Sequence, residues 1–172
     1  MDELGRISPE EFRHLTGTES VVVLDNLRSL QNIGSVFRTC DAFGIKKVYL
    51  CGITATPPHR EIQRTALVAT ESVEWQYYEN SVECVRDLIN DGYRIVSIEQ
   101  THKSKMLGAY EEGFENRTAF VLGNEVNGVD EQILALSYLH LEIPQKGTKH
   151  SLNVAVAAGI VLWETCGKGK TL

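Results

Sequence analysis

Three short segments carry the residue types that are best suited to chemistry. They are residues 32–38 (NIGSVFR), 122–125 (LGNE) and 143–153 (IPQKGTKHSLN). Each segment places small or amide residues where a predicted strand meets a loop or a helix, which is where open α/β sheets bind ligands. The pattern therefore indicates a ligand site at the ends of strands.

Arg38 is the cationic group of the first segment. The helical spacing of the apolar residues around it leaves Arg38 off the apolar face. A guanidinium has a pKa above about 12 and is a poor base, but it is well suited to hold a phosphate or to stabilise an oxygen that gains negative charge. We favour that chemistry for Arg38, with an ordinary surface arginine as the simpler alternative.

The second and third segments offer backbone and small polar groups. Gly123 allows the backbone to approach a ligand closely, although a plain turn glycine followed by a solvated Glu125 would give the same letters. Ser151 could merely cap a helix. Capping does not account for the whole third segment, in which a strand stops at Pro144, a polar loop follows, and Ser-Leu-Asn opens an apolar helix.

A regular alternation of strands and helices must position these residues. Runs of β-branched residues predict the strands, and apolar residues at helical spacing predict the helices between them. This alternation predicts an α/β fold, a parallel sheet flanked by helices on both faces. The expected strands are residues 21–24, 47–51, 73–77, 95–98, 118–122 and 140–143, and the expected helices are 33–43 (capped by Asn32 and Gly44), 60–69, 82–91, 130–137 and 153–165.

The last expected helix is apolar on nearly all sides. Between residues 154 and 163 every position is Val, Ala, Gly, Ile, Leu or Trp. A helix without a polar face must be buried all round. Because a helix at the end of a small domain usually keeps one wet face, we expect this one to meet a partner subunit or to thread through the fold.

Composition bounds the class of protein. The 172 residues suit one domain, which we place at residues 21–166, with an N-terminal arm at 1–20 and a tail at 167–172. No signal-like segment opens the chain, and the longest apolar stretch is about half of what a bilayer requires. We therefore expect a soluble, cytoplasmic protein with no membrane partner. The four cysteines and five histidines show no metal-ligand or disulfide spacing, so we expect free thiols and no metal.

The formal net charge of −6 argues against a nucleic acid partner, because phosphates are normally met by a basic surface. The acidic residues, however, concentrate at 71–83 and 111–115, away from the three segments. A local basic face on an acidic body is therefore our expectation, and evenly solvated charges are the alternative. The residues expected to contact RNA are Arg28, Arg38, Arg60, Arg64, Lys146 and Lys149.

The three segments, in this order, resemble the signature motifs of the SpoU-type (TrmH-like) branch of the SPOUT knotted RNA methyltransferases. The resemblance runs from about Val21 to Glu164. It implies a C-terminal trefoil knot, a homodimer formed through the C-terminal helix, and S-adenosyl-L-methionine as the cofactor. The implied reaction is methylation of a ribose 2′-hydroxyl. Because few residues precede the first strand, we favour tRNA over rRNA as the substrate.

The resemblance also implies roles for individual residues. Ile98 and Glu99 are included in the cofactor site only because they lie at the end of a predicted strand, since no motif marks them. The residues implied in catalysis are Arg38, Asn32, Glu125, Ser151 and Asn153. Those implied in cofactor binding are Ile98, Glu99, Leu122, Gly123, Asn124, Ile143, Ser151 and Leu152.

Two other readings compete with a methyltransferase. An NAD-type oxidoreductase would need G-x-G-x-x-G after the first strand, where residues 25–28 read DNLR instead. A non-catalytic RNA-binding homologue of the same fold is the second alternative. The intact set of Asn32, Arg38, Glu125, Ser151 and Asn153 argues against such a loss of activity.

Overall fold

The computed structural model describes residues 7–14, 18–148 and 151–167. Over these residues the chain forms one seven-stranded sheet in the order β3-β2-β1-β6-β4-β7-β5, and all of its strand pairings are parallel. The strands are β1 (Val21–Asp25), β2 (Lys47–Cys51), β3 (Glu74–Tyr78), β4 (Arg94–Ile98), β5 (Lys105–Met106), β6 (Thr118–Leu122) and β7 (Leu139–Glu142).

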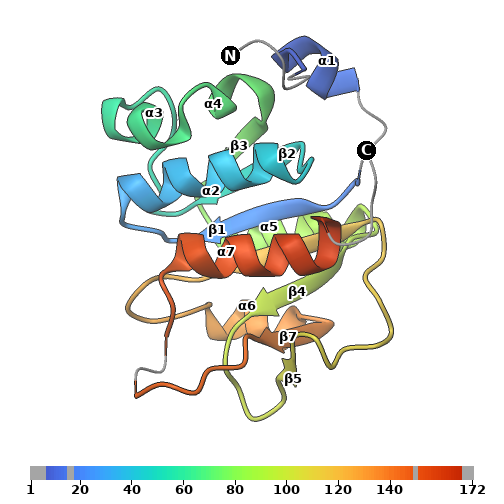
Figure 1. Ribbon diagram of the computed structural model, residues 1–172. Coiled ribbons are helices and arrows are strands. Elements are labelled where there is room, and N and C mark those ends of the chain that lie inside the picture. The colour runs from blue at the N-terminus through green and yellow to red at the C-terminus, as the bar shows by residue number, and fades with distance from the viewer. Residues whose placement is uncertain (1–6, 15–17, 149–150, 168–172) are drawn as a thin grey trace.

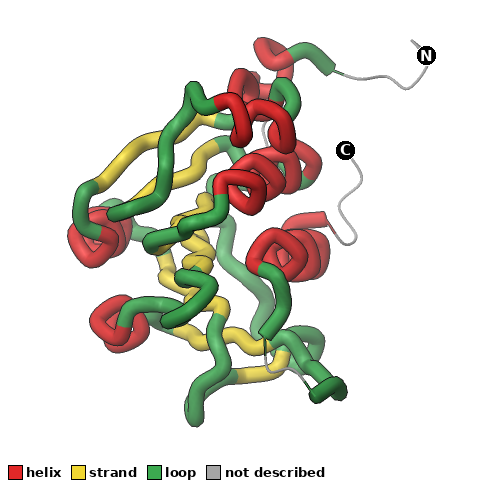
Figure 2. Tube along the Cα trace, turned by 90° about the vertical axis from the view of Figure 1, so that its left-hand side faces the viewer, coloured by secondary structure: helices red, strands yellow, loops and turns green. Residues whose placement is uncertain are grey.

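Helices cover both faces of this sheet. Figure 2 shows α2 and α7 on one side of the strands and two further helices, α5 and α6, on the other. The predicted α/β fold is therefore confirmed. The helices are α1 (Pro9–His14), α2 (Leu30–Ala42), α3 (Arg60–Ala66), α4 (Ala69–Ser72), α5 (Ser81–Asn90), α6 (Glu131–Leu136) and α7 (Val154–Leu162), and a π-helical turn (Trp163–Gly167) follows α7.

The strands supply both layers of the core by alternating their side chains. Val22 and Leu24 of β1 join the apolar cluster beneath α2 and α7, whereas Val21 and Val23 join the cluster beneath α5 and α6. Successive side chains of a strand point to opposite faces, so a strand buried on both faces must be apolar at every position. This explains why the first strand reads as an unbroken apolar run.

Two predicted helix boundaries were wrong, and one strand was missed. The helix expected at 33–43 begins earlier, because the Ser29 hydroxyl and not the Asn32 amide caps it. The helix expected at 60–69 ends at Ala66, since Leu67 takes a positive φ of 56°. The two-residue strand β5 was missed because it is shorter than any periodic signal.

The C-terminal helix packs along α2 but is not covered all round by its own chain. Val154, Ala158 and Val161 are buried, whereas Val156 and Ile160 are 51% and 37% exposed. Together with Trp163, which is 55% exposed, these two residues form an apolar stripe at helical spacing. We call Val156, Ile160 and Trp163 the exposed stripe of α7. The predicted trefoil knot stays a prediction.

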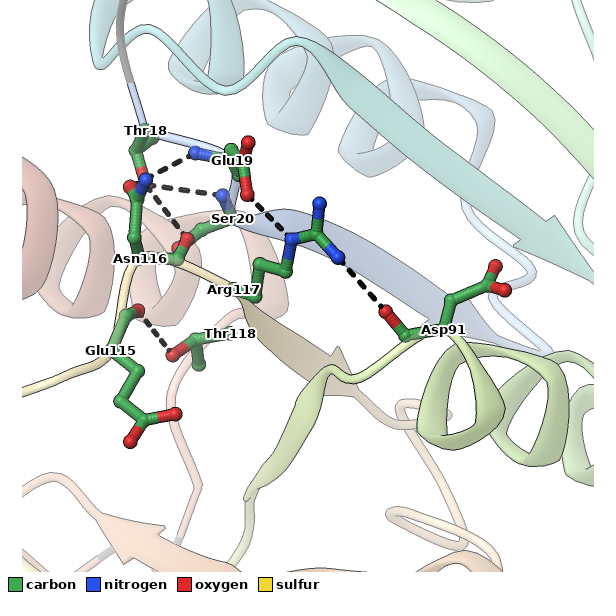
Figure 3. Close-up of polar contacts among 8 residues, drawn as sticks. All are labelled: Thr18, Glu19, Ser20, Asp91, Glu115, Asn116, Arg117 and Thr118. Atoms are coloured by element: carbon green, nitrogen blue, oxygen red, sulfur yellow. Dashed lines mark hydrogen bonds and ion pairs between the residues drawn. The ribbon is translucent and has the colours of Figure 1, made fainter.

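The chain ahead of β1 is fastened to the chain ahead of β6 (Figure 3). The Asn116 side-chain oxygen accepts the Glu19 N–H at 3.1 Å, and the Asn116 carbonyl accepts the Ser20 hydroxyl at 2.9 Å. Arg117 donates to the Glu19 carboxylate at 2.6 Å and to the Asp91 carbonyl at 3.2 Å. These contacts join the amino ends of two neighbouring strands. The division into an arm at 1–20, a domain at 21–166 and a tail stays a prediction.

Two classes of feature are absent from the described residues. None of their helices is both long and apolar enough to cross a membrane. They contain no cluster of His, Cys, Asp or Glu that could hold a metal ion. Cys40, Cys51, Cys84 and Cys166 are buried free thiols, as predicted.

Candidate active site

The three segments meet at the carboxyl edge of the sheet. In Figure 1 the strands point towards the left, and the loops that leave β1, β6 and β7 lie at that edge together with the starts of α2 and α7. Parallel strands bring their carboxyl ends to one edge, and strand order decides which loops are neighbours. Because β6 lies between β1 and β4, the loop with Glu125 lies beside the loop that leads into α2.

The carboxylate of Glu125 accepts hydrogen bonds at the start of α2. Its two oxygens accept the backbone N–H groups of Arg28 at 3.2 Å and Ser29 at 3.3 Å. The Asn32 side-chain amide donates to the same carboxylate at 3.4 Å. A helix start is electropositive and holds N–H groups without intrahelical partners, so an anion there is stabilised. Glu125 thus joins the second segment to the first.

These hydrogen bonds decide the charge of Glu125. Partial burial by itself would raise the pKa of its carboxyl. Hydrogen bonds from its own N–H, the Arg28 N–H, the Asn32 amide and the Ser29 N–H favour the ionised form and lower the pKa of Glu125 below its usual value. The side chain is therefore an ionised acceptor, and a carboxylate so well satisfied is a weak base.

The Asn153 side chain joins the third segment to the same point. Its amide nitrogen donates to the Asn32 side-chain oxygen at 3.1 Å, and its own oxygen accepts the Ala155 N–H at 2.9 Å, which caps α7. The direction of every bond from Glu125 through Asn32 to Asn153 is thereby fixed. We call these three side chains the amide junction. The structure thus brings together three of the five predicted catalytic residues.

Arg38 and Ser151 lie outside the amide junction. Arg38 is exposed on α2, six residues after Asn32, a rise of about 9 Å along the helix axis. No hydrogen bond or ion pair among the described residues involves it. Ser151 is exposed and does not cap α7, because Asn153 does so. Both side chains are therefore available to a ligand.

Gly123 is required by its own loop. A Cβ at this position would lie 2.2 Å from the carbonyl carbon of Gly128 and from the nitrogen of Val129. The close backbone approach that we predicted for a ligand is thus made by the chain itself. Asn124, another predicted cofactor residue, also builds this loop: its side chain accepts the N–H groups of Val126 and Asn127.

Glu99 also shapes the loop after β6. One of its carboxylate oxygens accepts the Val129 N–H at 3.0 Å, and the other accepts the Gln100 N–H at 3.0 Å. Leu122 is buried at the end of β6, and Ile98 and Ile143 are partly buried against the core beneath α7. The side chains of Glu99 and Leu122 therefore belong to the structure that positions the loop after β6.

A pocket of about 500 Å³ is lined by the segment that precedes α7 and ends next to Asn153 in the sequence. This volume is within the range of roughly 300–1,000 Å³ that is common for small-molecule sites. Leu152 supplies apolar surface, and the hydroxyls and backbone around it can set the orientation of a ligand. The lining residues are Gln145, Lys146, Gly147, Thr148, Ser151 and Leu152, of which Ser151 and Leu152 were predicted to bind the cofactor.

Of the residues predicted to contact RNA, some are exposed and one is in an ion pair. Arg28 and Lys146 are exposed on loops at the carboxyl edge, and Arg60 is exposed at the start of α3. Arg64 faces the Glu61 carboxylate at 3.8 Å, so it is the weakest member of the set. Lys149 lies outside the described residues.

Sequence reasoning missed Asp25 and Thr54. The Asp25 carboxylate, 2% exposed, accepts the Asp130 N–H at 3.0 Å and so fixes the start of α6. The Thr54 hydroxyl accepts the Leu27 N–H at 2.9 Å and donates to the Leu24 carbonyl. An acidic residue at the end of an apolar strand was the signal for Asp25. Thr54 lies in a turn-rich loop and gave none.

Comparison with known proteins identifies the class. The fold is that of a parallel α/β protein, and the amide junction lies at the carboxyl edge of its sheet. A model of the SpoU rRNA Methylase family matches residues 19–163. The chain belongs to this family, as its motifs predicted.

Curated relatives include enzymes that act on tRNA and on rRNA. The chain is 30% identical over 150 residues to the tRNA (guanosine(18)-2'-O)-methyltransferase of Aquifex aeolicus. This alignment covers 84% of this chain and 67% of that protein. It is 28% identical over 154 residues to the 23S rRNA (guanosine-2'-O-)-methyltransferase of Neisseria meningitidis, covering 90% and 60%. The chain thus spans about two thirds or less of the length of these relatives.

Solved structures agree with the family. The TrmH/SpoU tRNA modifying enzyme of A. aeolicus superposes with a TM-score of 0.80 at 25% identity, over 93% of this chain and 81% of that one. The AdoMet-bound rRNA methyltransferase of Sinorhizobium meliloti gives a TM-score of 0.82 at 26% identity, over 96% and 62%. The fold is therefore that of the SpoU-type methyltransferases.

Proposed function

We propose that the chain transfers a methyl group from S-adenosyl-L-methionine to the 2′-hydroxyl of a ribose in RNA. The observation that carries the proposal is the amide junction, because it joins the three family segments at one point, and the third of these segments also lines a pocket with Ser151 and Leu152. The names of the A. aeolicus and N. meningitidis relatives, both 2'-O-methyltransferases, support the same reaction.

The pocket suits an adenosyl cofactor. When bound, S-adenosyl-L-methionine supplies a methyl carbon attached to a positively charged sulfur. Leu152 can pack against a flat base, and backbone groups of the loop at 145–148 can bond its polar edge. The S. meliloti relative, solved with AdoMet bound, supports this choice. We include Ile143 and the backbone around Gly123 in the cofactor site.

The amide junction can orient the ribose. Asn32 and Asn153 each donate one side-chain N–H to a hydrogen bond within the junction. The other side-chain N–H of each has no partner in the described part of the chain. The groups that the junction offers to a substrate are therefore donors, which suit hydroxyl and phosphate oxygens. We assign Glu125 to holding these amides in place, since its lowered pKa makes it a poor proton acceptor.

Arg38 would act on the RNA and not on the cofactor. Its guanidinium is exposed and has no partner among the described residues, so it can reach a phosphate next to the target ribose. The same group can stabilise negative charge that develops on the ribose oxygen. Among RNA substrates we put tRNA first, in line with the A. aeolicus relative, and rRNA second.

We also propose that two copies associate through α7. The exposed stripe of Val156, Ile160 and Trp163 is apolar surface that its own chain does not cover. Burying such surface contributes roughly 25 cal/mol per Å². The cytoplasmic location and the trefoil knot expected from the sequence are compatible with this proposal and stay predictions.

Transfer of label tests the reaction. The purified chain would be incubated with methyl-labelled S-adenosyl-L-methionine and a pool of tRNA and rRNA transcripts made in vitro, which carry no modification. Label in the RNA is the expected result. RNA binding without transfer, at any cofactor concentration that saturates the pocket, would instead favour the non-catalytic RNA-binding homologue.

A further inference from the structure

Asn26, the first residue after β1, has an unusual backbone. Its φ is 57°, in the left-handed region that residues other than glycine rarely adopt and that asparagine tolerates better than most. The backbone therefore turns sharply here, between the end of β1 and the start of α2. The direction in which Arg28 and Ser29 leave the sheet depends on this turn.

The side chain of Asn26 binds the last residue of β1 and the loop after β2. Its amide nitrogen donates to the Asp25 carboxylate at 2.8 Å, and its oxygen accepts the Ile53 N–H at 3.1 Å. A Cβ on Gly52, which has a φ of 61°, would lie 2.0 Å from that oxygen. The loop after β2 is thus shaped to receive the Asn26 side chain.

The main chain of Asn26 binds a third loop. Its carbonyl accepts the Asn124 side-chain amide at 2.6 Å. The oxygen of that same Asn124 side chain accepts the N–H groups of Val126 and Asn127, so Asn124 and the residues that it holds flank Glu125 in the chain. One residue therefore connects the loops that leave three neighbouring strands, β2, β1 and β6.

We infer that Asn26 is a positioning residue for methyl transfer, which sets the start of α2 and the loop of Glu125 in register with each other. Glu125 takes its hydrogen bonds from Arg28 and Ser29, two and three residues after Asn26. A small shift at Asn26 would move these donors away from an acceptor that is fixed through Asn124. The inference rests on the proposed function and assigns Asn26 no contact with substrate.

The substitution Asn26→Gly tests this role. Glycine adopts a positive φ freely, so the turn and its carbonyl bond to Asn124 can persist while the two side-chain bonds are lost. Asn116→Gly is the matched control (Figure 3). The Asn116 side chain also bonds the backbone of a distant segment, but it joins β1 and β6 at their amino ends, far from the amide junction.

Four measurements would be made on the full chain. They are the single-turnover rate at saturating RNA transcripts, the affinity for S-adenosylhomocysteine, the melting temperature, and hydrogen exchange of backbone amides. A misplacement of about 1 Å can cost on the order of a hundredfold in rate. We therefore expect Asn26→Gly to slow single turnover by about tenfold to a hundredfold and to change cofactor affinity by less than about threefold. Exchange should quicken together in the loops at 26–29, 52–54 and 124–128.

The control separates positioning from general stability. Asn116→Gly should lower the melting temperature about as much as Asn26→Gly and leave the rate unchanged. An unaltered rate in Asn26→Gly, or an equal loss of rate in both variants, would overturn the inference. If the wild-type chain transfers no methyl group, the proposed function is wrong. In that case hydrogen exchange still tests Asn26: if Asn26→Gly speeds exchange in only one of the three loops, Asn26 does not connect them.

Discussion

The side-chain amide of Asn153 donates to the side-chain oxygen of Asn32 at 3.1 Å, across 121 positions of sequence. The bond joins the capping residue of α7 to the first turn of α2, so two helices that pack side by side also share a polar contact at their starts. The second N–H of each amide faces no other described partner. The contact thus links the third segment to the first, and a single substitution at Asn153 can remove it.

Asn153→Asp should remove the contact and keep the cap. A carboxylate accepts the Ala155 N–H as well as the amide does, because Asp and Asn cap helices about equally. It cannot donate to Asn32, however, and two acceptor oxygens would face each other. We expect the free energy of unfolding to change by less than about 1 kcal/mol and the transfer rate to fall about tenfold to a hundredfold.

Asn80→Asp is the control for this change. Asn80 caps α5 with its side-chain oxygen, and its amide nitrogen makes no hydrogen bond in the described residues. The same substitution there should alter neither transfer nor stability by more than a small amount. Stopped-flow or quenched single-turnover assays would compare the two variants. A wild-type rate in Asn153→Asp would exclude the contact from the mechanism.

Glu125 should make stability depend on pH. Its folded pKa is lowered by hydrogen bonds, so its contribution is present above the unfolded value of about 4.3 and is lost as the pH falls through the folded pKa. We expect wild type to be more stable than Glu125→Gln at pH 7. The gap should narrow steadily below about pH 5. Urea unfolding of both proteins between pH 3 and 7 measures it, and a gap that widens in acid would show that the assigned sign is wrong.

Arg38→Ala should slow the chemical step. If the guanidinium stabilises the developing charge, the variant loses about a hundredfold to a thousandfold in single turnover at saturating RNA, and cofactor affinity stays near wild type. Arg38→Lys should recover little, because an ammonium lacks the planar fork. Arg86→Ala, on the opposite face of the sheet in α5, is the control. Full turnover by Arg38→Ala would remove this residue from the catalytic set.

The exposed stripe of α7 should control the oligomeric state. Light scattering of the wild-type chain should give twice 19.2 kDa. Ile160→Glu should give a monomer, since a charge cannot be buried cheaply in an apolar contact. Ile89→Glu on α5 is a matched control, because Ile89 is 38% exposed and Ile160 is 37% exposed. A wild-type chain that is monomeric at micromolar concentration would contradict the proposed dimer.

Local sequence patterns predicted the elements well, because a strand buried on both faces has to be apolar throughout. They could not predict which strands are neighbours. The position of β6 between β1 and β4 follows from contacts between distant segments, and it is this order that places Glu125 beside the start of α2. The motifs thus identified the candidate residues, whereas their arrangement depends on contacts between segments that are distant in the sequence.

Several motif residues turned out to serve the fold as well as the site. A Cβ on Gly34 would lie 2.0 Å from the Thr65 hydroxyl and 2.4 Å from the Ile62 carbonyl, so this glycine allows α3 to pack closely on α2. Gly123 and Asn124 build their own loop in the same way. A single sequence cannot separate a glycine that makes room for a ligand from one that makes room for a helix.

If this site methylates a ribose oxygen, the labelled RNA should resist alkaline hydrolysis at the methylated nucleotide. Alkali cleaves RNA through a free 2′-hydroxyl, so a 2′-O-methylated nucleotide stays joined to its neighbour as a dinucleotide. We predict that the label transferred by the wild-type chain is recovered in alkali-resistant dinucleotides, and that Asn153→Asp lowers this yield. Label recovered only in mononucleotides would place the methyl group on a base and contradict the account.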